Sequence, residues 1–283
     1  MKQLLVFLIF PSMLFGQITY SGKIVSKKSK EKIPYASVGL IKENIGTNAD
    51  ESGFFTLTGS ISKEHDSLIV SCVGYETRIV EVKGQSNCLI ELEERPMILK
   101  EVIVNAKQSW CYKILNKLNG LGDACNTTSG QQLQIARHFS VNVDDAVLTE
   151  VNICKSNSIF LPHLAIFRLR VYDIDSVTKG PSNDLCDQVI EVRTKSRVVN
   201  IDLEKYQIHI PKRDFFIAIE WLKIKENESG TKDHQTYNPC VGITFNKDKS
   251  YNAEVWGLMN YKKNFWMKMM NLKDVAISAT VKY

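Results

Sequence analysis

The chain has 283 residues, of which 44% are hydrophobic and 24% charged, a composition typical of a globular protein of about two domains. Its 15 glycines and 7 prolines exclude collagen-like and low-complexity chains. A formal charge of +5, scattered along the sequence, is too small for a nucleic-acid-binding surface, so we expect no nucleic-acid partner.

The first residues have the pattern of an export signal. Lys2 supplies a positive start, residues 4–10 form an apolar core, and residues 12–16 offer a cleavage region. A membrane anchor would need about 20 apolar residues, and Pro11 interrupts this run. We therefore expect residues 1–16 to be a signal peptide, and the protein to reach the periplasm, the outer-membrane surface or the medium.

Residues 17–95 predict a small β-sandwich, because short alternating runs are separated by turn signals. Asp50 and Gly53 have the spacing of a turn that opens with Asp and closes with Gly, so Asp50 is interpreted as a turn-forming residue rather than a catalytic acid. The expected strands are residues 18–26, 36–41, 53–57, 67–73, 78–82 and 88–92.

Three groups of residues in this part resemble the carboxypeptidase-regulatory-like domain through their combined spacing. They are Ile33-Pro34-Tyr35-Ala36-Ser37-Val38, then Gly46-Thr47 with Asp50 and Gly53-Phe54-Phe55, then Leu68 to Ser71 with Val73-Gly74-Tyr75. The resemblance covers about a quarter of the chain. It implies a transthyretin-like seven-stranded sandwich at the N-terminus of an exported Bacteroidetes-type protein, an accessory or docking module without catalytic residues.

Residues 99–104 resemble the short strand that joins this domain to the plug of TonB-dependent receptors. Such a receptor also needs a barrel of about 22 strands, which residues 105–283 cannot supply. Receptor identity is therefore rejected.

Residues 96–132 are predicted to be a linker that contains a short helix at residues 106–119. Trp110, Ile114 and Leu118 fall at helical spacing on one face, and Gly120 would end the helix.

Residues 133–283 predict a second, jelly-roll-like sandwich. The stretch around Phe167-Arg168-Leu169 is loosely similar to a C-terminal sandwich of Bacteroidetes proteins of unassigned role, a resemblance that implies the fold and no mechanism. The whole chain is thus expected to be mainly β, with two sandwiches joined by a short helix. The strands expected here are residues 134–141, 158–171, 187–192, 197–203, 214–221, 241–245, 253–258, 265–270 and 275–282.

Seven cysteines, an odd number, leave at least one thiol without an internal partner. None forms a C-x-x-C pair, and several lie in alternating strands where cysteine behaves as a small buried hydrophobe. We expect mostly free thiols with one or two disulfides at most, and Cys111 with Cys125 is the first pair to test.

No catalytic motif is present in the sequence. The five histidines never form H-E-x-x-H, so the family name of the first domain brings no peptidase helix with it. A nucleophile elbow, a phosphate loop and a dinucleotide fingerprint are also missing. A site assembled across the fold remains an alternative, because such sites are spatial rather than sequential. The protein is expected not to be an enzyme.

Four acidic residues suggest a structural calcium site, the one cofactor considered. Asp173 and Asp175 flank Ile174 at a strand end, and Asp184 and Asp187 follow in the next loop. Hard oxygen ligands of this kind suit Ca²⁺. The alternative is a solvated acidic loop whose carboxylates cap turns.

Four aromatic residues of the second domain are the ligand-binding candidates: Tyr251, Trp256, Tyr261 and Trp266. An exposed ring can stack on a sugar, while nearby Asn and Lys side chains bind hydroxyl groups. The alternative is that strand alternation sends Trp256 and Trp266 into the core. Tyr261 lies in an expected hairpin turn and is the best candidate for exposure.

These observations favour a non-catalytic cell-envelope or secreted accessory protein that contacts a glycan or another surface protein, with association with the outer membrane as one option. A hydrolase acting on envelope or dietary polymers is the first alternative. A small outer-membrane barrel formed by residues 133–283 is the second, and charges such as Arg168, Arg170 and Glu220 interrupt the lipid-facing band it would need.

Overall fold

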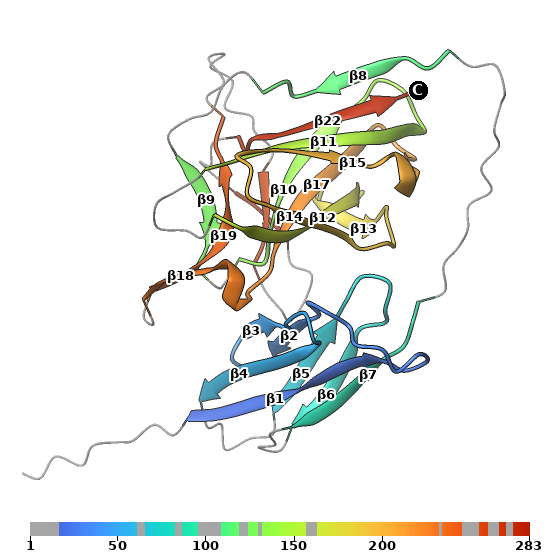
Figure 1. Ribbon diagram of the computed structural model, residues 1–283. Helices are drawn as coiled ribbons and strands as arrows, with labels where there is room; N and C mark the ends of the chain where they lie inside the picture. Colours follow the sequence, from blue (N-terminus) through green and yellow to red (C-terminus); the bar gives the residue numbers. More distant parts are fainter. Residues whose placement is uncertain are drawn as a thin grey trace, which may run out of the picture.

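The computed structural model consists almost entirely of β-strands, arranged in two units that lie one above the other in Figure 1. Within the described residues, the only helical segments are the single turns η1 (Glu204–Tyr206) and η2 (Lys225–Asn227), too short to cross a membrane. The predicted signal peptide lies outside the described residues. The structure describes residues 17–60, 66–82, 87–95, 109–118, 124–129, 132–156, 163–231, 234–244, 255–259, 266–269 and 274–283.

The first unit is a sandwich of two sheets, as predicted. Three strands form one sheet in the order β4–β1–β7, and four form the other in the order β3–β2–β5–β6. The seven strands agree with the family resemblance, and β3 is the strand that the sequence did not separate from its turn. Their bounds are β1 (Gln17–Ser26), β2 (Ser37–Leu40), β3 (Ile45–Asn48), β4 (Phe54–Ser60), β5 (Asp66–Ser71), β6 (Arg78–Val82) and β7 (Cys88–Leu92).

The turn between β3 and β4 is formed by Asp50, which confirms its interpretation as a turn-forming residue. Its Oδ1 accepts hydrogen bonds from the backbone N–H of Ser52 at 2.8 Å and of Phe54 at 3.0 Å. Gly53 has φ +77°, and a Cβ there would lie 2.8 Å from the carbonyl oxygen of Ile24. Only glycine meets both requirements without strain.

The second unit is a larger sandwich of two sheets (Figure 1). One sheet, the seven-stranded sheet, runs β13–β12–β17–β10–β20–β21, with β14 also on β12. The other, the eight-stranded sheet, runs β18–β19–β11–β22–β8, with β15 and β16 on β11 and β9 on β19. Their bounds are β8 (Tyr112–Leu115), β9 (Cys125–Thr128), β10 (Gln134–Ser140), β11 (Ala146–Ser156), β12 (Ala165–Ile174), β13 (Pro181–Asp184), β14 (Ile190–Thr194), β15 (Val198–Asp202), β16 (Ile208–Ile210), β17 (Asp214–Trp221), β18 (Glu228–Thr231), β19 (His234–Gly242), β20 (Val255–Leu258), β21 (Trp266–Lys268) and β22 (Ile277–Lys282).

The core of this unit is made by alternate residues of facing strands. Phe167 and Leu169 of β12, Phe215 and Ile217 of β17, and Ile277 of β22 are all at most 1% exposed. Alternation sends their neighbours to the outer faces of the two sheets, so each sheet carries a second surface.

The predicted helix at 106–119 is wrong in its described part, because residues 112–115 form strand β8. β8 pairs with β22, and β9 pairs with β19, so two strands of the second unit lie inside the predicted linker at 96–132. Strand β11, which no expected strand covered, pairs with β15, β16, β19 and β22 and forms the centre of its sheet.

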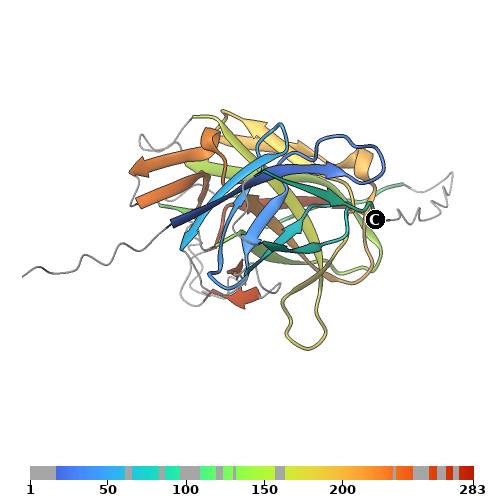
Figure 2. The same ribbon diagram turned by 90° about the horizontal axis from the view of Figure 1, so that it is seen from below.

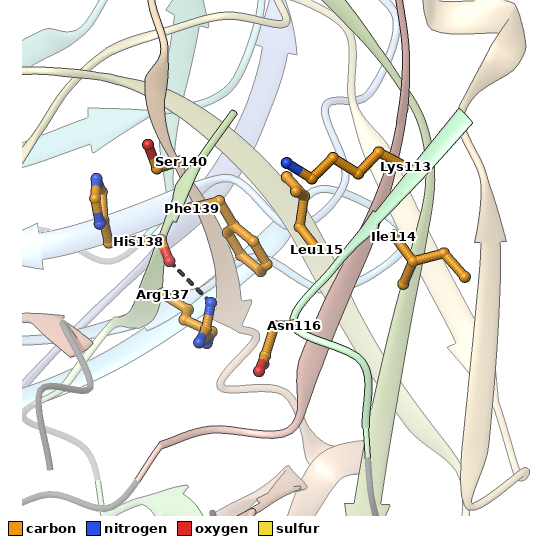
Figure 3. Close-up of a pocket in the computed structure, with 8 residues that line it drawn as sticks. All are labelled: Lys113, Ile114, Leu115, Asn116, Arg137, His138, Phe139 and Ser140. Atoms are coloured by element: carbon orange, nitrogen blue, oxygen red, sulfur yellow. Dashed lines mark hydrogen bonds between the residues drawn. The ribbon is translucent and has the colours of Figure 1, made fainter. Parts of the chain in front are cut away.

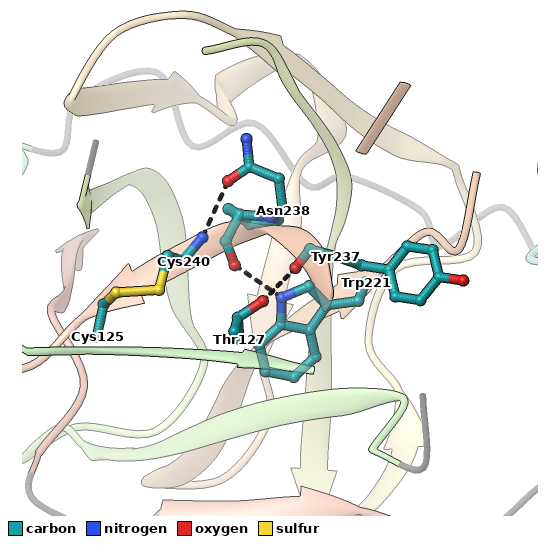
Figure 4. Close-up of a disulfide and its surroundings, with 7 residues drawn as sticks. Cys125, Thr127, Trp221, Tyr237, Asn238 and Cys240 are labelled. Carbon is teal, nitrogen blue, oxygen red and sulfur yellow. Dashed lines mark hydrogen bonds between the residues drawn. A yellow bond between two sulfur atoms is a disulfide. The ribbon is translucent and has the colours of Figure 1, made fainter. Parts of the chain in front are cut away.

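The first cysteine pair proposed from the sequence is also wrong. Cys125 of β9 is bonded to Cys240 of β19 (Figure 4). Cys111 is free and exposed. Thr127 donates a hydrogen bond to the carbonyl oxygen of Tyr237 beside the disulfide. The indole N–H of Trp221 donates to the carbonyl oxygen of Pro239 at 2.8 Å, which ties the same strand to the core.

The two units meet where β2, β3 and their turns contact the chain after β17. Asn48 is buried, and its Oδ1 accepts a hydrogen bond of 2.9 Å from the backbone N–H of Lys223. Its Nδ2 donates to the carbonyl oxygen of Tyr35 at 3.3 Å. Around these bonds, Tyr35 packs against Ile166 and Leu222 in one buried cluster.

Arg168 makes a second polar contact between the units. Its side chain is 2% exposed, and its Nη2 donates to the carbonyl oxygen of Pro34 at 2.8 Å. Its Nη1 lies 3.8 Å from Glu220 Oε1 within the second unit. A buried guanidinium needs such partners, because an unpaired buried charge is strongly destabilising. The contact therefore holds the first unit against one end of the seven-stranded sheet.

We expect replacement of both Cys125 and Cys240 by Ser to lower the free energy of unfolding in urea under oxidising conditions. The bridge closes a loop across a sequence separation of 115, for which chain entropy sets an upper figure of about 4–5 kcal/mol. Cys111→Ser is the matched control and should change stability by less than about 0.5 kcal/mol. If Cys111→Ser lost as much unfolding free energy as the double variant, the observed pairing would be contradicted.

We expect Lys223 to make stability rise with pH above neutrality. Burial lowers the pKa of Lys223 to about 7, so the unfolded chain, with a lysine pKa of about 10.4, binds more protons above pH 7. The penalty for burying the charged amine is therefore complete below pH 7 and is relieved as the pH rises. In urea titrations at pH 6–9, the free energy of wild type relative to Lys223→Met should increase by up to about 1.4 kcal/mol per pH unit. A difference in unfolding free energy between the two proteins that stays constant from pH 6 to 9 would contradict the prediction.

Candidate functional site

The predicted aromatic residues do not form an exposed platform in the described part of the chain. Trp256 of β20 is 8% exposed, and its ring packs edge-on against Phe216 with centroids 6.2 Å apart. A Cβ on Gly180 would lie 2.7 Å from the Trp256 ring, so the backbone of that loop covers it. Trp256 is a core residue of the outer face of the seven-stranded sheet.

Trp266 of β21 is half-buried and lies edge-on to Tyr172, with centroids 5.4 Å apart. It packs against the same outer-face cluster as Trp256. Tyr251 and Tyr261 lie outside the described residues, so their prediction stays untested.

The four acidic residues proposed as calcium ligands do not share a site, because each has its own partner or is exposed to solvent. Asp173 pairs with Lys212 at 2.9 Å, and Asp184 makes a bidentate contact with Arg170 at 2.6 and 2.7 Å. Asp175 accepts hydrogen bonds from Val177, Thr178 and the Thr178 hydroxyl, which lower its pKa, and Asp187 is exposed. Over the described residues, no group of three or more acidic, His or Cys side chains could hold a metal ion. The geometry gives the calcium prediction no support.

One histidine does meet a carboxylate beside a pocket. His138 Nε2 lies 3.0 Å from Asp214 Oδ1, and both residues line a pocket of about 470 Å³ at one end of the seven-stranded sheet. Register places them there, because His138 on β10 pairs with Phe216 on β17, two residues from Asp214. The remaining lining residues are Ile174, Asp175, Ser176, Lys179 and Lys212. An imidazole oriented by a carboxylate could bind a polar ligand or act as a general base.

Exposed aromatic rings lie instead at the start of β8 and two residues before it. Trp110 is 49% exposed and Tyr112 is 61% exposed, and both point to the outer face of the eight-stranded sheet because they occupy alternate positions. Ile114, at the next such position, is 57% exposed. In Figure 1, β8 lies on the side of the second unit that faces away from the first unit. These rings are therefore open to a large ligand.

The Trp110 ring is held in place by its neighbour on β22. Lys282 is paired with Tyr112, and its ammonium lies 5.2 Å from the centroid of the Trp110 ring. Lys282 is itself fixed by Glu204 at 3.0 Å. A cation over one ring face orients the indole and leaves the other parts of this half-exposed side chain for a ligand.

Polar side chains extend this surface across the sheet. Asn152 Nδ2 donates to Glu150 Oε1 at 2.6 Å, and Asn200 Nδ2 donates to Asn152 Oδ1 at 3.1 Å. Glu150 pairs with Thr280 of β22, which in turn lies beside Ile114 of β8. We call Trp110, Tyr112, Glu150, Asn152 and Asn200 the open face. It combines two exposed rings with a row of hydrogen-bonding groups.

The sequence contains the pattern of this face, but its interpretation as a helix is wrong. Trp110 and Ile114 are four residues apart, which suits a helix, but Trp110, Tyr112 and Ile114 are also spaced by two, which suits a strand. Local pattern does not separate the two choices in so short a run. Pairing with β22 decides between them.

Over its whole length, the chain has only weak similarity to known proteins. No curated protein matches it. The cysteine protease Cwp84 (Clostridium difficile) matches at 11% identity and TM-score 0.39, covering 94% of this chain and 70% of that one. A DUF3823 family protein from Bacteroides ovatus matches at 11% identity and TM-score 0.23, covering 82% of this chain and 100% of that one. Another from Bacteroides uniformis matches at 8% identity and TM-score 0.22, covering 95% and 99%. These scores are too low to assign a common fold.

The first unit gives a specific result. Residues 20–104 match the family model described as the CarboxypepD_reg-like domain. The matched residues include all three groups on which the resemblance rests, together with most of the seven-stranded sandwich. The N-terminal part of this chain is therefore a CarboxypepD_reg-like domain.

Proposed function

We propose that the protein is a non-catalytic accessory protein of the bacterial cell envelope, exported by its first 16 residues, that binds glycan on the open face. The leader pattern supports export, and so does the Cys125–Cys240 disulfide, because such bonds persist in oxidising compartments. A CarboxypepD_reg-like domain at residues 20–104 supports an accessory role.

The single observation that carries the glycan proposal is the exposure of Trp110 and Tyr112 on the same outer face of the sheet as the Asn152–Asn200 row. Aromatic rings pack on the C–H faces of sugars, and amide groups bind sugar hydroxyls. Exposed rings are costly for solubility, so a pair on one face marks an interaction surface. Glu150 disfavours an anionic polymer, so the expected ligand is a neutral polysaccharide.

We expect Trp110→Ala and Tyr112→Ala each to weaken binding of a neutral polysaccharide by at least about tenfold, because aromatic side chains that a ligand covers on binding contribute a large share of the binding energy. Isothermal titration with hydroxyethyl cellulose, laminarin and xyloglucan measures the effect. The control is Leu89→Ala, an equally exposed apolar residue of the first unit.

Two outcomes would contradict this assignment. Wild-type protein that binds none of a broad glycan array would remove the glycan proposal and leave a surface protein as the ligand. Binding lost in Tyr251→Ala or Tyr261→Ala, but retained in Trp110→Ala, would move the site to the residues proposed from the sequence.

A second candidate function, a hydrolase, is favoured by the His138–Asp214 pair in its pocket. If the pair acts as an oriented general base, wild-type protein should release reducing ends from a polysaccharide or cleave an ester substrate. His138→Ala should then lower the rate by about 10²–10⁴-fold. Under the non-catalytic proposal, we expect no turnover above buffer with either protein, measured by reducing-sugar and chromogenic ester assays.

A further inference from the structure

Strand β8 has an open hydrogen-bonding edge. Cys111 N–H donates to the carbonyl oxygen of Tyr283 at 2.9 Å, and Tyr283 N–H donates back to Cys111 at 3.1 Å. Because such pairs alternate in an antiparallel ladder, the backbone groups of Tyr112 and Ile114 face away from β22. Over the described ranges, no strand pairs with that side of β8.

The facing end of β10 extends beyond its partner strand β20. β20 pairs with β10 only from Gln134 to Arg137. Val141 N–H donates to Arg213 at 2.8 Å, so odd-numbered residues face β17, and the backbone groups of His138 and Ser140 face the side that β20 has left. The His138 carbonyl accepts a hydrogen bond of 2.9 Å from Arg137 Nη1.

The open edge of β8 and this end of β10 border one groove of about 420 Å³. Figure 3 shows Lys113 extending from β8 toward β10, while Ser140 lies across from it. The residues that line this edge groove are Lys113, Ile114, Leu115, Asn116, Arg137, His138, Phe139 and Ser140.

The edge groove carries an unneutralised positive charge. Arg137 is neutralised by Asp274 through two contacts of 2.7 and 2.8 Å, and His138 is held by Asp214. Within the described part of the chain, Lys113 forms no ion pair. A carboxylate entering the groove would therefore meet the Lys113 ammonium.

We propose that the edge groove receives an extended segment of a partner protein, which adds to β8 as a new strand and places an acidic side chain against Lys113. Main-chain hydrogen bonds to Tyr112 and Ile114 would supply affinity, and the lysine would supply selectivity. An inward-pointing lysine on an edge strand discourages indiscriminate pairing, and an acidic side chain removes that penalty.

A second copy of this chain is a poorer occupant. Two β8 edges paired antiparallel about their centres would bring the two Lys113 side chains together, and like charges opposite each other are destabilising. An acidic partner segment has the opposite, favourable charge.

The test uses the full chain and two fluorescein-labelled heptapeptides, one alternating glutamate with valine and one alternating lysine with valine. By fluorescence anisotropy, the glutamate peptide should bind at least about tenfold more tightly than the lysine peptide, and Lys113→Glu should reverse that order. Polysaccharide affinity should be retained in Lys113→Glu, which separates this proposal from the glycan proposal.

A backbone variant tests strand addition itself. Ile114→Pro removes an N–H that faces the open edge and not β22, a position where proline is tolerated. It should weaken the glutamate peptide by at least about tenfold, while the matched Ile114→Thr, which keeps the N–H, should change binding less than about threefold. Melting curves check that both variants fold. If Ile114→Pro does not fold, the charge reversal in Lys113→Glu tests the proposal by itself.

Three results would overturn the proposal. The first is no binding of the glutamate peptide at millimolar concentration, and the second is equal binding of both peptides. The third is a wild-type dimer in sedimentation that Ile114→Pro or Lys113→Glu dissociates, which would make a second copy the occupant.

Discussion

The arrangement of the molecule depends on a small set of buried polar contacts between its two units. Arg168 reaches the Pro34 carbonyl, and Asn48 receives the Lys223 N–H. These groups lose water when the units meet, so they are stable only while both partners stay in place. Figure 2, seen from below, shows the first unit lying across the second. This contact lies at one end of the seven-stranded sheet, whereas β8 of the eight-stranded sheet lies on the side that faces away from the first unit (Figure 1).

The two outer faces of the second unit consequently differ in character. On the outer face of the seven-stranded sheet, the aromatic side chains of Phe216, Trp256 and Tyr172 pack in one buried cluster. The loop that contains Gly180 covers the Trp256 ring. On the eight-stranded sheet, Trp110 and Tyr112 stay exposed on the same outer face as hydrogen-bonding side chains. The difference explains why the proposed ligand face and the edge groove both involve β8. Because β8 is a short strand at the edge of its sheet, the rings of Tyr112 and the nearby Trp110 lie at the surface. Within the described residues, the β8 backbone pairs with another strand on one side only.

Sequence patterns predicted the first unit well because its interactions are mostly local. Asp50 and Gly53 form their turn through contacts a few residues apart, and alternation in β4 and β5 matches their burial. The second unit was harder. Residues 146–156 hold alternating positions, but with polar Thr149, Glu150 and Asn152 among them the run was not recognised as a strand. Its polar residues lie on an outer face or form cross-strand hydrogen bonds, as Thr149 does by donating to the carbonyl oxygen of Thr280. The strand pattern is therefore recognisable only once the partner strands are known.

By itself the sequence determined the mainly β class, the CarboxypepD_reg-like character of the first unit and the absence of catalytic motifs, because composition, turn residues and alternation act over short distances. Tertiary structure alone decided that Cys125 bonds to Cys240, that Tyr112 and Ile114 lie on a strand, and that Trp256 is buried. Each of these outcomes depends on a partner far away in the chain. A disulfide needs two sulfurs brought together in space, a strand needs a neighbour, and a ring is buried only by what covers it.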